Sequence, residues 1–326
     1  MRSSFARACR ITASILIGTL SLASQSFAQT TTVRLAWTPS ADAAQIAVAL
    51  DKQLWKSKNV EVTTVSFPTG REALEALIGG QVDFAAIAEF PAAIAALRNQ
   101  RFGVIADLSR YTGNRIVTTD DITSITGLAG KKVGATVGTN TQYQTETALA
   151  AAKVSATIVN VAPPDLLSAL VRKDIDAAAV FPAFVGRAKQ MLGQKYNELP
   201  TPSYVTHFLI AASDEVLNNH PDSVKAFLSG LIAADAIVRG DVAATQQSIV
   251  KATGGAQKLD SIAQLWPDYE FGVVLQESLA VLMADEAKWI LGKGLIKNDK
   301  ATPDIVRSFI RPDFLKQVAA DRVTLK

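Results

Sequence analysis

Cysteine is almost absent from this sequence, and the one that is present, Cys9, lies near the amino end. Residues 1–28 have the pattern of a secretory signal peptide, because three arginines precede a short apolar run, 11–22, and the segment ends at the small residue Ala28. We therefore expect a mature protein that begins at Gln29 and contains no cysteine. Disulfides, thiol catalysis and cysteine metal ligands are then excluded.

Long hydrophobic runs and an excess of charge are also missing. No apolar run reaches the roughly 20 residues that a membrane-spanning helix needs. The formal charge of +3 comes entirely from Arg2, Arg7 and Arg10, so the rest of the chain is formally neutral. A neutral chain has no basic field to attract nucleic acid or an anionic membrane. We expect an exported, soluble, periplasmic monomer that binds no nucleic acid and is not inserted into the membrane after signal cleavage.

Aromatic residues are sparse as well, at 7% of the chain, although 48% of the residues are hydrophobic. Abundant alanine and valine suit helices packed closely on a parallel sheet better than a β-sandwich. The length of 326 residues favours about two domains. These properties predict an α/β protein with a large core.

Strand and helix patterns alternate along the chain, as expected for this class. The predicted strands are 33–37, 60–67, 82–88, 132–137, 157–161, 175–181 and 204–212. The predicted helices between them are 43–55, 71–78, 92–99, 144–152 and 166–172, and helical patterns dominate beyond residue 214.

Residues 128–153 form the most informative unit, because they have the pattern of a strand, a polar turn and a helix. Gly138 ends the strand, and residues 139–141 supply small polar side chains of the kind that open helices. Thr139 or Thr141 can form a capping box with the glutamine three residues later. Free backbone N–H groups at such a turn can bind an anion or a polar head group.

An internal repeat supports two similar halves. The pattern of residues 76–87 recurs 93 residues later in residues 169–180. Each copy ends in a predicted strand, and an aspartate is its second residue, Asp83 in the first copy and Asp176 in the second. Each copy follows a predicted strand, turn and helix. The repeat therefore predicts two related α/β lobes.

These features resemble the periplasmic substrate-binding proteins of ABC importers, in the family that serves nitrate, taurine, alkanesulfonates and thiamine-pyrimidine precursors. Three segments carry the resemblance in order, 128–141, 169–178 and 281–296. The resemblance implies an α/β two-lobed periplasmic-binding-protein fold (type II), each lobe a mainly parallel sheet flanked by helices, with two hinge crossovers. Lobe 1 would combine residues 30–107 and 207–326, and lobe 2 would be residues 109–206.

The family also places ligand contacts at the turns that follow strands. The residues that this implies are Trp37, Ser40, Thr69, Arg71, Glu89, Phe90, Thr139, Asn140, Thr141 and Phe181. Arg71 either holds a sulfonate or carboxylate or is simply solvated at the start of its helix. Glu89 either binds an amine or N–H donor or simply suits a helix start. Phe67 joins Trp37, Phe90 and Phe181 as a potential apolar wall.

The implied function is capture of a small organic solute, such as a sulfonate, a carboxylate or a nitrogen-containing or aromatic compound, and its delivery to an ABC permease and its ATPase. We expect no catalytic residues, no metal site and no cofactor. Two alternatives stay open. One is an enzyme on the same two-lobed fold, similar to a dehydratase or a pyrimidine synthase, and the other is a soluble sensor.

Overall fold

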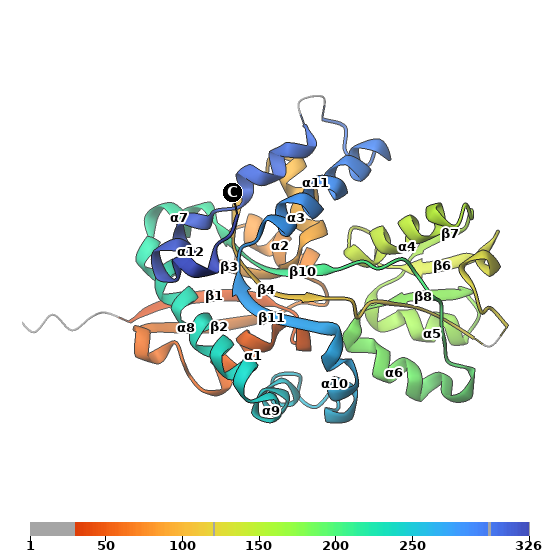
Figure 1. The fold of residues 1–326 in the computed structure, drawn as a ribbon, viewed down its shortest axis with the longest axis horizontal. Coiled ribbons are helices and arrows are strands. Elements are labelled where there is room, and N and C mark those ends of the chain that lie inside the picture. The colour runs from red at the N-terminus through yellow and green to blue at the C-terminus, as the bar shows by residue number, and fades with distance from the viewer. Residues whose placement is uncertain (1–29, 120, 299–300, 326) are drawn as a thin grey trace, which may run out of the picture.

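Two β-sheets with flanking helices make up the protein, as the computed structural model shows for residues 30–119, 121–298 and 301–325 (Figure 1). The first sheet contains, in spatial order, β11 (Tyr269–Val274), β4 (Phe102–Tyr111), β10 (Thr206–Ser213), β3 (Phe84–Ala88), β1 (Thr31–Trp37) and β2 (Val60–Ser66). The second contains β7 (Thr157–Asn160), β6 (Lys132–Ala135), β8 (Ala177–Val180), β5 (Arg115–Thr118) and β9 (Asn197–Glu198). The predicted α/β class is confirmed, and the predicted signal peptide lies outside the described residues.

Helices pack around both sheets (Figure 1). The helices near the first sheet are α1 (Ala44–Asp51), α2 (Gly70–Ile78), α3 (Glu89–Leu97), α7 (Asp214–Asn219), α8 (Pro221–Gly240), α9 (Val242–Ala252), α10 (Leu259–Leu265), α11 (Glu277–Gly292) and α12 (Pro312–Val318). Those near the second sheet are α4 (Asn140–Ala151), α5 (Leu166–Val171) and α6 (Pro182–Leu192). Within the described part of the chain, no helix combines the length and apolarity needed to cross a bilayer.

The strand directions bring the turns that follow several strands to one edge of each sheet. In the first sheet β1 pairs in parallel with β2 and β3, and β10 is inserted antiparallel between β3 and β4. β1 to β4 therefore all run the same way, while β10 and β11 run against them. In the second sheet β6 pairs in parallel with β7 and β8, and β5 runs antiparallel to β8. The antiparallel strand β11 was not assigned from the sequence.

The internal repeat has a structural counterpart at the two repeated aspartates. A carboxylate oxygen of Asp83 accepts a hydrogen bond of 2.7 Å from the backbone N–H of Arg34 in β1. A carboxylate oxygen of Asp176 accepts one of 2.8 Å from the backbone N–H of Lys132 in β6. Each aspartate precedes a strand, β3 or β8, and satisfies a backbone donor of the parallel strand beside it, so the same residue serves the same purpose twice.

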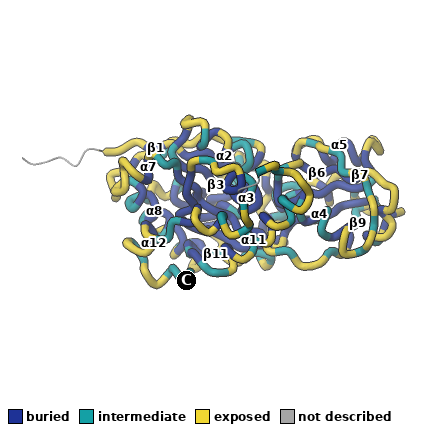
Figure 2. The backbone as a smooth tube through the Cα atoms, turned by 90° about the horizontal axis from the view of Figure 1, so that it is seen from above, coloured by how far each residue is buried: buried dark blue, intermediate teal, exposed yellow. Residues whose placement is uncertain are grey.

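A stack of three aromatic rings anchors the core of the first sheet. Phe227 of α8 stacks on Phe84 of β3 with ring centroids 4.1 Å apart, and on Trp55 with centroids 5.2 Å apart. The indole N–H of Trp55 donates a hydrogen bond of 2.9 Å to the backbone oxygen of Phe227. Figure 2 shows the buried residues concentrated inside both halves of the molecule. The stack therefore packs α8 against the sheet through buried rings.

Among the residues that the structure describes, the chain crosses between the sheets twice. It leaves the first sheet after Tyr111 and enters the second at Arg115, and it returns between Glu198 and Thr206. The two passages fall near the hinge crossovers implied by the resemblance. The exact lobe boundaries, at residues 107–109 and 206–207, stay predictions.

Candidate ligand-binding site

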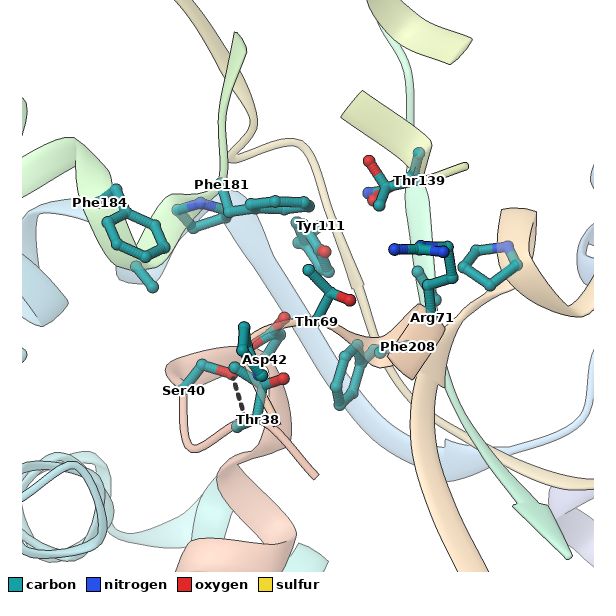
Figure 3. A pocket seen from close by; sticks show the side chains of 17 residues that line it. Thr38, Ser40, Asp42, Thr69, Arg71, Tyr111, Thr139, Phe181, Phe184 and Phe208 are labelled. Atoms are coloured by element: carbon teal, nitrogen blue, oxygen red, sulfur yellow. Dashed lines mark hydrogen bonds between the residues drawn. The ribbon is translucent and has the colours of Figure 1, made fainter. Parts of the chain in front are cut away.

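A cleft lies where the carboxyl ends of strands from the two sheets face each other (Figure 3). The turns after β1, β2 and β3 line it from the first sheet, and the turns after β6 and β8 line it from the second. The cleft holds about 550 Å³ of space, open solvent at its mouth included. Turns at the carboxyl ends of strands are where open α/β sheets bind ligands.

Several of the predicted site residues meet in this cleft. The residues that line it are Ser40, Thr69, Arg71, Thr139, Asn140 and Phe181. Thr69 is also the N-cap of α2, where its hydroxyl oxygen accepts a hydrogen bond of 3.3 Å from the backbone N–H of Glu72. That bond is the first half of a capping box, so the local sequence both starts the helix and sets the turn at the cleft.

The turn before α4 adopts a different geometry from the predicted capping box. Thr139 is the N-cap of α4, but its hydroxyl donates a hydrogen bond of 2.7 Å to the backbone oxygen of Thr136 and makes no cap bond. The side chain of Gln142 instead accepts a hydrogen bond of 2.8 Å from the backbone N–H of Gly138. The side chain of Thr139 therefore accepts no hydrogen bond from the N–H groups at the start of α4, although it lines the cleft.

Arg71 reaches from the first turn of α2 towards the turn that precedes α4. One terminal nitrogen, Nη1, donates a hydrogen bond of 2.9 Å to Glu75 on the same helix. The Nε atom is buried and has no hydrogen-bond partner among the described residues. A guanidinium with an unused donor is suited to a carboxylate, sulfonate or carbonyl oxygen of a solute in the cleft.

Replacing Gly138 with alanine is expected to displace Arg71. Gly138 has a φ of +82°, and a Cβ atom there would lie 2.9 Å from Cδ of Arg71. We expect a loss of about 1 kcal/mol or more in the free energy of unfolding, measured in urea, together with weaker solute binding. Gly130→Ala is the matched control, since its φ is +69° and no atom lies within 4 Å of the added Cβ. Equal solute affinity in the two variants would contradict a role for the position of Arg71.

Asp42 brings a carboxylate into the same cleft, and the sequence analysis did not select it. It lies in a short 3-10 turn, Ala41–Ala43, directly after the turn that follows β1. Burial raises the pKa of Asp42 to about 6, and the hydroxyl groups of Ser40 and Tyr111 offset this in part. None of the described lysine, arginine or histidine side chains forms an ion pair with it. A cationic group of a solute would supply the missing partner.

Other cleft residues were also not selected from the sequence. The aromatic ones among them are Tyr111 on β4, Phe184 on α6 and Phe208 on β10. Tyr111 ends the strand before the first chain crossing, and Phe208 lies in the strand after the second. Only the tertiary structure brings them together. Phe184 lies three residues after the predicted site residue Phe181, on the first turn of the next helix, which was a usable signal. With Phe181, these rings give the cleft an aromatic wall (Figure 3).

Four predicted site residues, Trp37, Glu89, Phe90 and Thr141, do not line the cleft. Trp37 is the last residue of β1, and its buried ring lines a separate surface hollow beside Asp51. Phe90 is fully buried and packs against the ring of Trp289, and α3 begins one residue before it, with Ala88 as the N-cap. The sequence predicted this helix over residues 92–99, so its start is corrected to Glu89. Thr141 lies inside α4, where its hydroxyl is 2.9 Å from the hydroxyl of Thr139.

Glu89 also lies behind the cleft lining. Its side chain is fully buried and is bound by the hydroxyl of Tyr204. Its other oxygen accepts a hydrogen bond of 2.9 Å from the backbone N–H of His207. Both carboxylate oxygens of Glu89 thus form internal hydrogen bonds, because the first turn of α3 directs this side chain towards β10. The alternative in which Glu89 binds an amine of the solute stays a prediction.

Comparison with known proteins places the chain in a family. The model of the NMT1/THI5-like family matches residues 40–238, which is more than half of the chain. The chain belongs to the NMT1/THI5-like family. The matched segment includes every residue that lines the cleft except Thr38. The family resemblance therefore covers the cleft itself.

Relatives of this NMT1/THI5-like protein include binding proteins. A binding protein of Brucella abortus is 25% identical over 198 residues, which cover 58% of this chain and 61% of the relative, less than two thirds of its length. The taurine-binding periplasmic protein of Escherichia coli is 26% identical over 216 residues, 64% of this chain and 66% of that protein. The solved alkanesulfonate-binding protein of Xanthomonas axonopodis pv. citri, bound to MOPS, shares the fold, with a TM-score of 0.74 and 15% identity over 87% of this chain and 99% of that one.

The NMT1/THI5-like chain shows no arrangement suited to a metal ion in the part that the structure describes. No three or more His, Cys, Asp or Glu side chains come together there as metal ligands. The polar groups of the cleft are instead one unpaired carboxylate, one guanidinium with a free donor, and the hydroxyl and amide groups of the turns. This set is suited to binding an organic molecule through hydrogen bonds and charge.

Proposed function

We propose that this protein is the extracytoplasmic solute-binding component of an ABC importer. It captures a small organic solute in the cleft between the two sheets and delivers it to a membrane permease and its ATPase. The observation that carries the proposal is the lining of the cleft by strand-end turns from both sheets, because one solute can then contact both halves of the molecule at once. Membership of the NMT1/THI5-like family supports this role.

The two halves would act as lobes that close on the solute. Lobe 1 would contain residues 30–107 and 207–326, lobe 2 residues 109–206, and the two chain crossings would serve as the hinge. A solute that touches both lobes only in the closed form shifts the population towards that form. The permease would then recognise the closed shape of a periplasmic monomer.

The charges of the cleft favour an amphoteric solute with an apolar body. Asp42 would pair with an ammonium or another N–H donor, and Arg71 would bind a carboxylate, sulfonate or carbonyl oxygen. The two side chains form no ion pair with each other and lie apart in the cleft (Figure 3). The rings of Phe181, Phe184 and Phe208 would contact the apolar part. A small inorganic anion would meet an unpaired carboxylate and leave the aromatic wall unused.

A thermal-shift screen tests the proposal directly. Protein produced from Gln29 onward would be heated with taurine, MOPS, simple alkanesulfonates, aliphatic and aromatic carboxylates, amino acids, nitrate and thiamine-pyrimidine precursors. A solute that binds only the folded state raises the melting temperature, with about 2.7 kcal/mol of added stability at 100 times its Kd. We expect a saturable increase for a compound that carries both an amine and an acid.

The same screen can contradict the role. Each mixture would also be analysed for new compounds by mass spectrometry. Conversion of a compound without any saturable shift would favour an enzyme on this fold. A shift for nitrate alone would contradict the assignment of Asp42 and the aromatic wall to the solute.

A further inference from the structure

Two buried glutamates meet at one tyrosine hydroxyl beside the second chain crossing. Glu89 on α3 and Glu286 on α11 are both fully buried. The hydroxyl oxygen of Tyr204 is hydrogen-bonded to Oε1 of Glu89 and lies 2.8 Å from Oε1 of Glu286. Tyr204 belongs to the segment between β9 and β10, so this cluster ties the crossing segment to two helices of the first sheet.

A count of hydrogen atoms shows that this cluster needs an added proton. A tyrosine hydroxyl has one hydrogen and can donate to only one carboxylate, while an ionised carboxylate can only accept. Both contacts of Tyr204 can be hydrogen bonds only if one glutamate carries a proton and donates it to the tyrosine oxygen. The geometry therefore matches two carboxyl groups that share a single negative charge.

Glu286 is the better place for that proton. The second oxygen of Glu89 accepts the backbone N–H of His207, whereas Oε2 of Glu286 is buried without a hydrogen-bond partner among the described residues. An ionised carboxylate in that position would be poorly solvated, which favours the neutral form. Burial raises the pKa of Glu286 well above its usual range, and the charge of Glu89 adds to this effect. Burial also raises the pKa of Glu89.

Further charged and titratable groups surround the pair, and none of the described cations forms an ion pair with Glu286. The groups on the elements packed around it are Glu277, Asp285 and Lys288 on α11, Lys293 directly after α11, Tyr143 and Glu146 on α4, His207 on β10, Asp107 and Arg110 on β4, and Asp304 and Arg307 on the 3-10 segment Pro303–Phe309. Most of them have partners of their own, since Lys293 pairs with Glu146, Asp107 with His207 and Arg110, and Arg307 with Glu277.

The crossing segment next to Tyr204 is also tied to the cleft. Two residues later, the hydroxyl oxygen of Thr206 accepts a hydrogen bond of 2.9 Å from the side chain of Asn140, which lines the cleft from α4. It accepts another of 3.1 Å from Asn114 at the first crossing. Movement of the second sheet away from the first would pull on this segment, and therefore on Tyr204.

We propose that Glu89, Tyr204 and Glu286 form a proton-binding site, and that uptake of one proton from solvent favours the closed arrangement of the cleft. The proposal rests on the proposed function in one respect, since it takes the two crossings to be the hinge. In an open form Tyr204 no longer bridges the two glutamates, water reaches them, and both ionise near neutral pH. Closing then binds a proton, and the closed population increases as the pH falls.

The sign and size of the effect follow from linkage. The proton is bound more tightly in the closed form than in the open form, where a solvated glutamate has an ordinary pKa of about 4.3. Between that value and the raised pKa of the closed form, the ratio of closed to open molecules increases up to about tenfold for each unit of decrease in pH. Above the raised pKa of the closed form the preference is lost.

Distance measurements between spin labels test the proposal without any solute. The chain from Gln29 onward has no cysteine, so Ala243→Cys on α9 and Gln190→Cys on α6, both exposed, would carry the two labels. Double electron–electron resonance at pH 5.5 and pH 8 would give the closed fraction. We expect more closed molecules at pH 5.5. Glu286→Gln is expected to remove the pH response, because its amide can donate to Tyr204 at either pH.

The controls separate this cluster from other titrating groups. Asp285→Asn, an exposed neighbour on the same helix, is expected to keep the pH response. Tyr204→Phe removes the bridging hydroxyl and is expected to abolish the response even if Glu286→Gln folds poorly. An unchanged distance distribution in the parent protein, or an equal pH response in Glu286→Gln, would overturn the proposal. The spin-label experiment uses no solute, so its outcome does not depend on whether the thermal-shift screen finds one.

Discussion

Replacing Phe227 with alanine is expected to lower the free energy of unfolding by about 3–5 kcal/mol. Its ring lies between those of Phe84 and Trp55, with centroids 4.1 Å and 5.2 Å away, and it is fully buried. Alanine would leave a cavity in the stack and remove contacts from both neighbours, while the hydrogen bond from Trp55 to the backbone oxygen could remain. Chemical denaturation monitored by circular dichroism would measure the loss.

Two further variants make this prediction specific. Phe227→Leu keeps most of the volume and is expected to cost less than the alanine variant. Gly230→Ala disturbs the same stack by a steric clash, since an added Cβ would lie 2.2 Å from Cδ1 of Trp55. A change of less than about 1 kcal/mol for Phe227→Ala would mean that the stack does not anchor α8.

Replacing Asp42 with asparagine is expected to weaken binding of an amine-bearing solute by about 100-fold, because removal of one partner of a buried charge pair costs several kcal/mol. The wild-type affinity for such a solute should be constant above pH 6 and decrease by up to tenfold per pH unit below it. The reason is that the pKa of Asp42 in the free protein is about 6 and the ammonium needs the ionised form. The Asp42→Asn protein should lack this decrease. Isothermal titration calorimetry across this pH range would measure both effects.

The controls for Asp42 use the solute as well as the protein. An alkanesulfonate without an amine should bind the Asp42→Asn protein at least as well as the wild type, since a repelling charge is removed. Asp165→Asn changes an exposed aspartate and should leave both affinities unchanged. Proton uptake by the Glu89 and Glu286 pair would favour closure and raise the affinity as the pH falls, which opposes the effect of Asp42. The wild type and the Asp42→Asn protein are therefore compared with each other at each pH. Equal affinity of both proteins for the amine would exclude Asp42 from the solute site.

The parts of the site that were predictable from the sequence are those that depend on local order along the chain. Thr69 and Thr139 follow strands and start helices, and a parallel arrangement of those strands brings such turns to one edge. Asp42 and Phe208 needed knowledge of the tertiary structure, because they enter the cleft from a short 3-10 turn and from a strand that the chain reaches only after building the second sheet.

Glu89 shows why position in a turn does not fix the direction of a side chain. The sequence placed it correctly after β3, but the helix begins at Glu89 itself instead of at the predicted residue 92. This shift of the helix start directs the carboxylate towards Tyr204 and the backbone of His207. Element ends are uncertain by one or two residues in any reading of a sequence, and one residue rotates a helical side chain by about 100°.

The insertion of β10 between β3 and β4 has a consequence for the order of folding. β5 to β9 are consecutive in the chain, so the second sheet can form as soon as residues up to 198 have emerged. The first sheet stays split, with β3 and β4 unpaired along facing edges, until β10 arrives from residue 206 onward. Such non-local pairing is slow, and exposed strand edges aggregate. A chain truncated before β10 should therefore contain a folded second sheet and depend on chaperones for the rest.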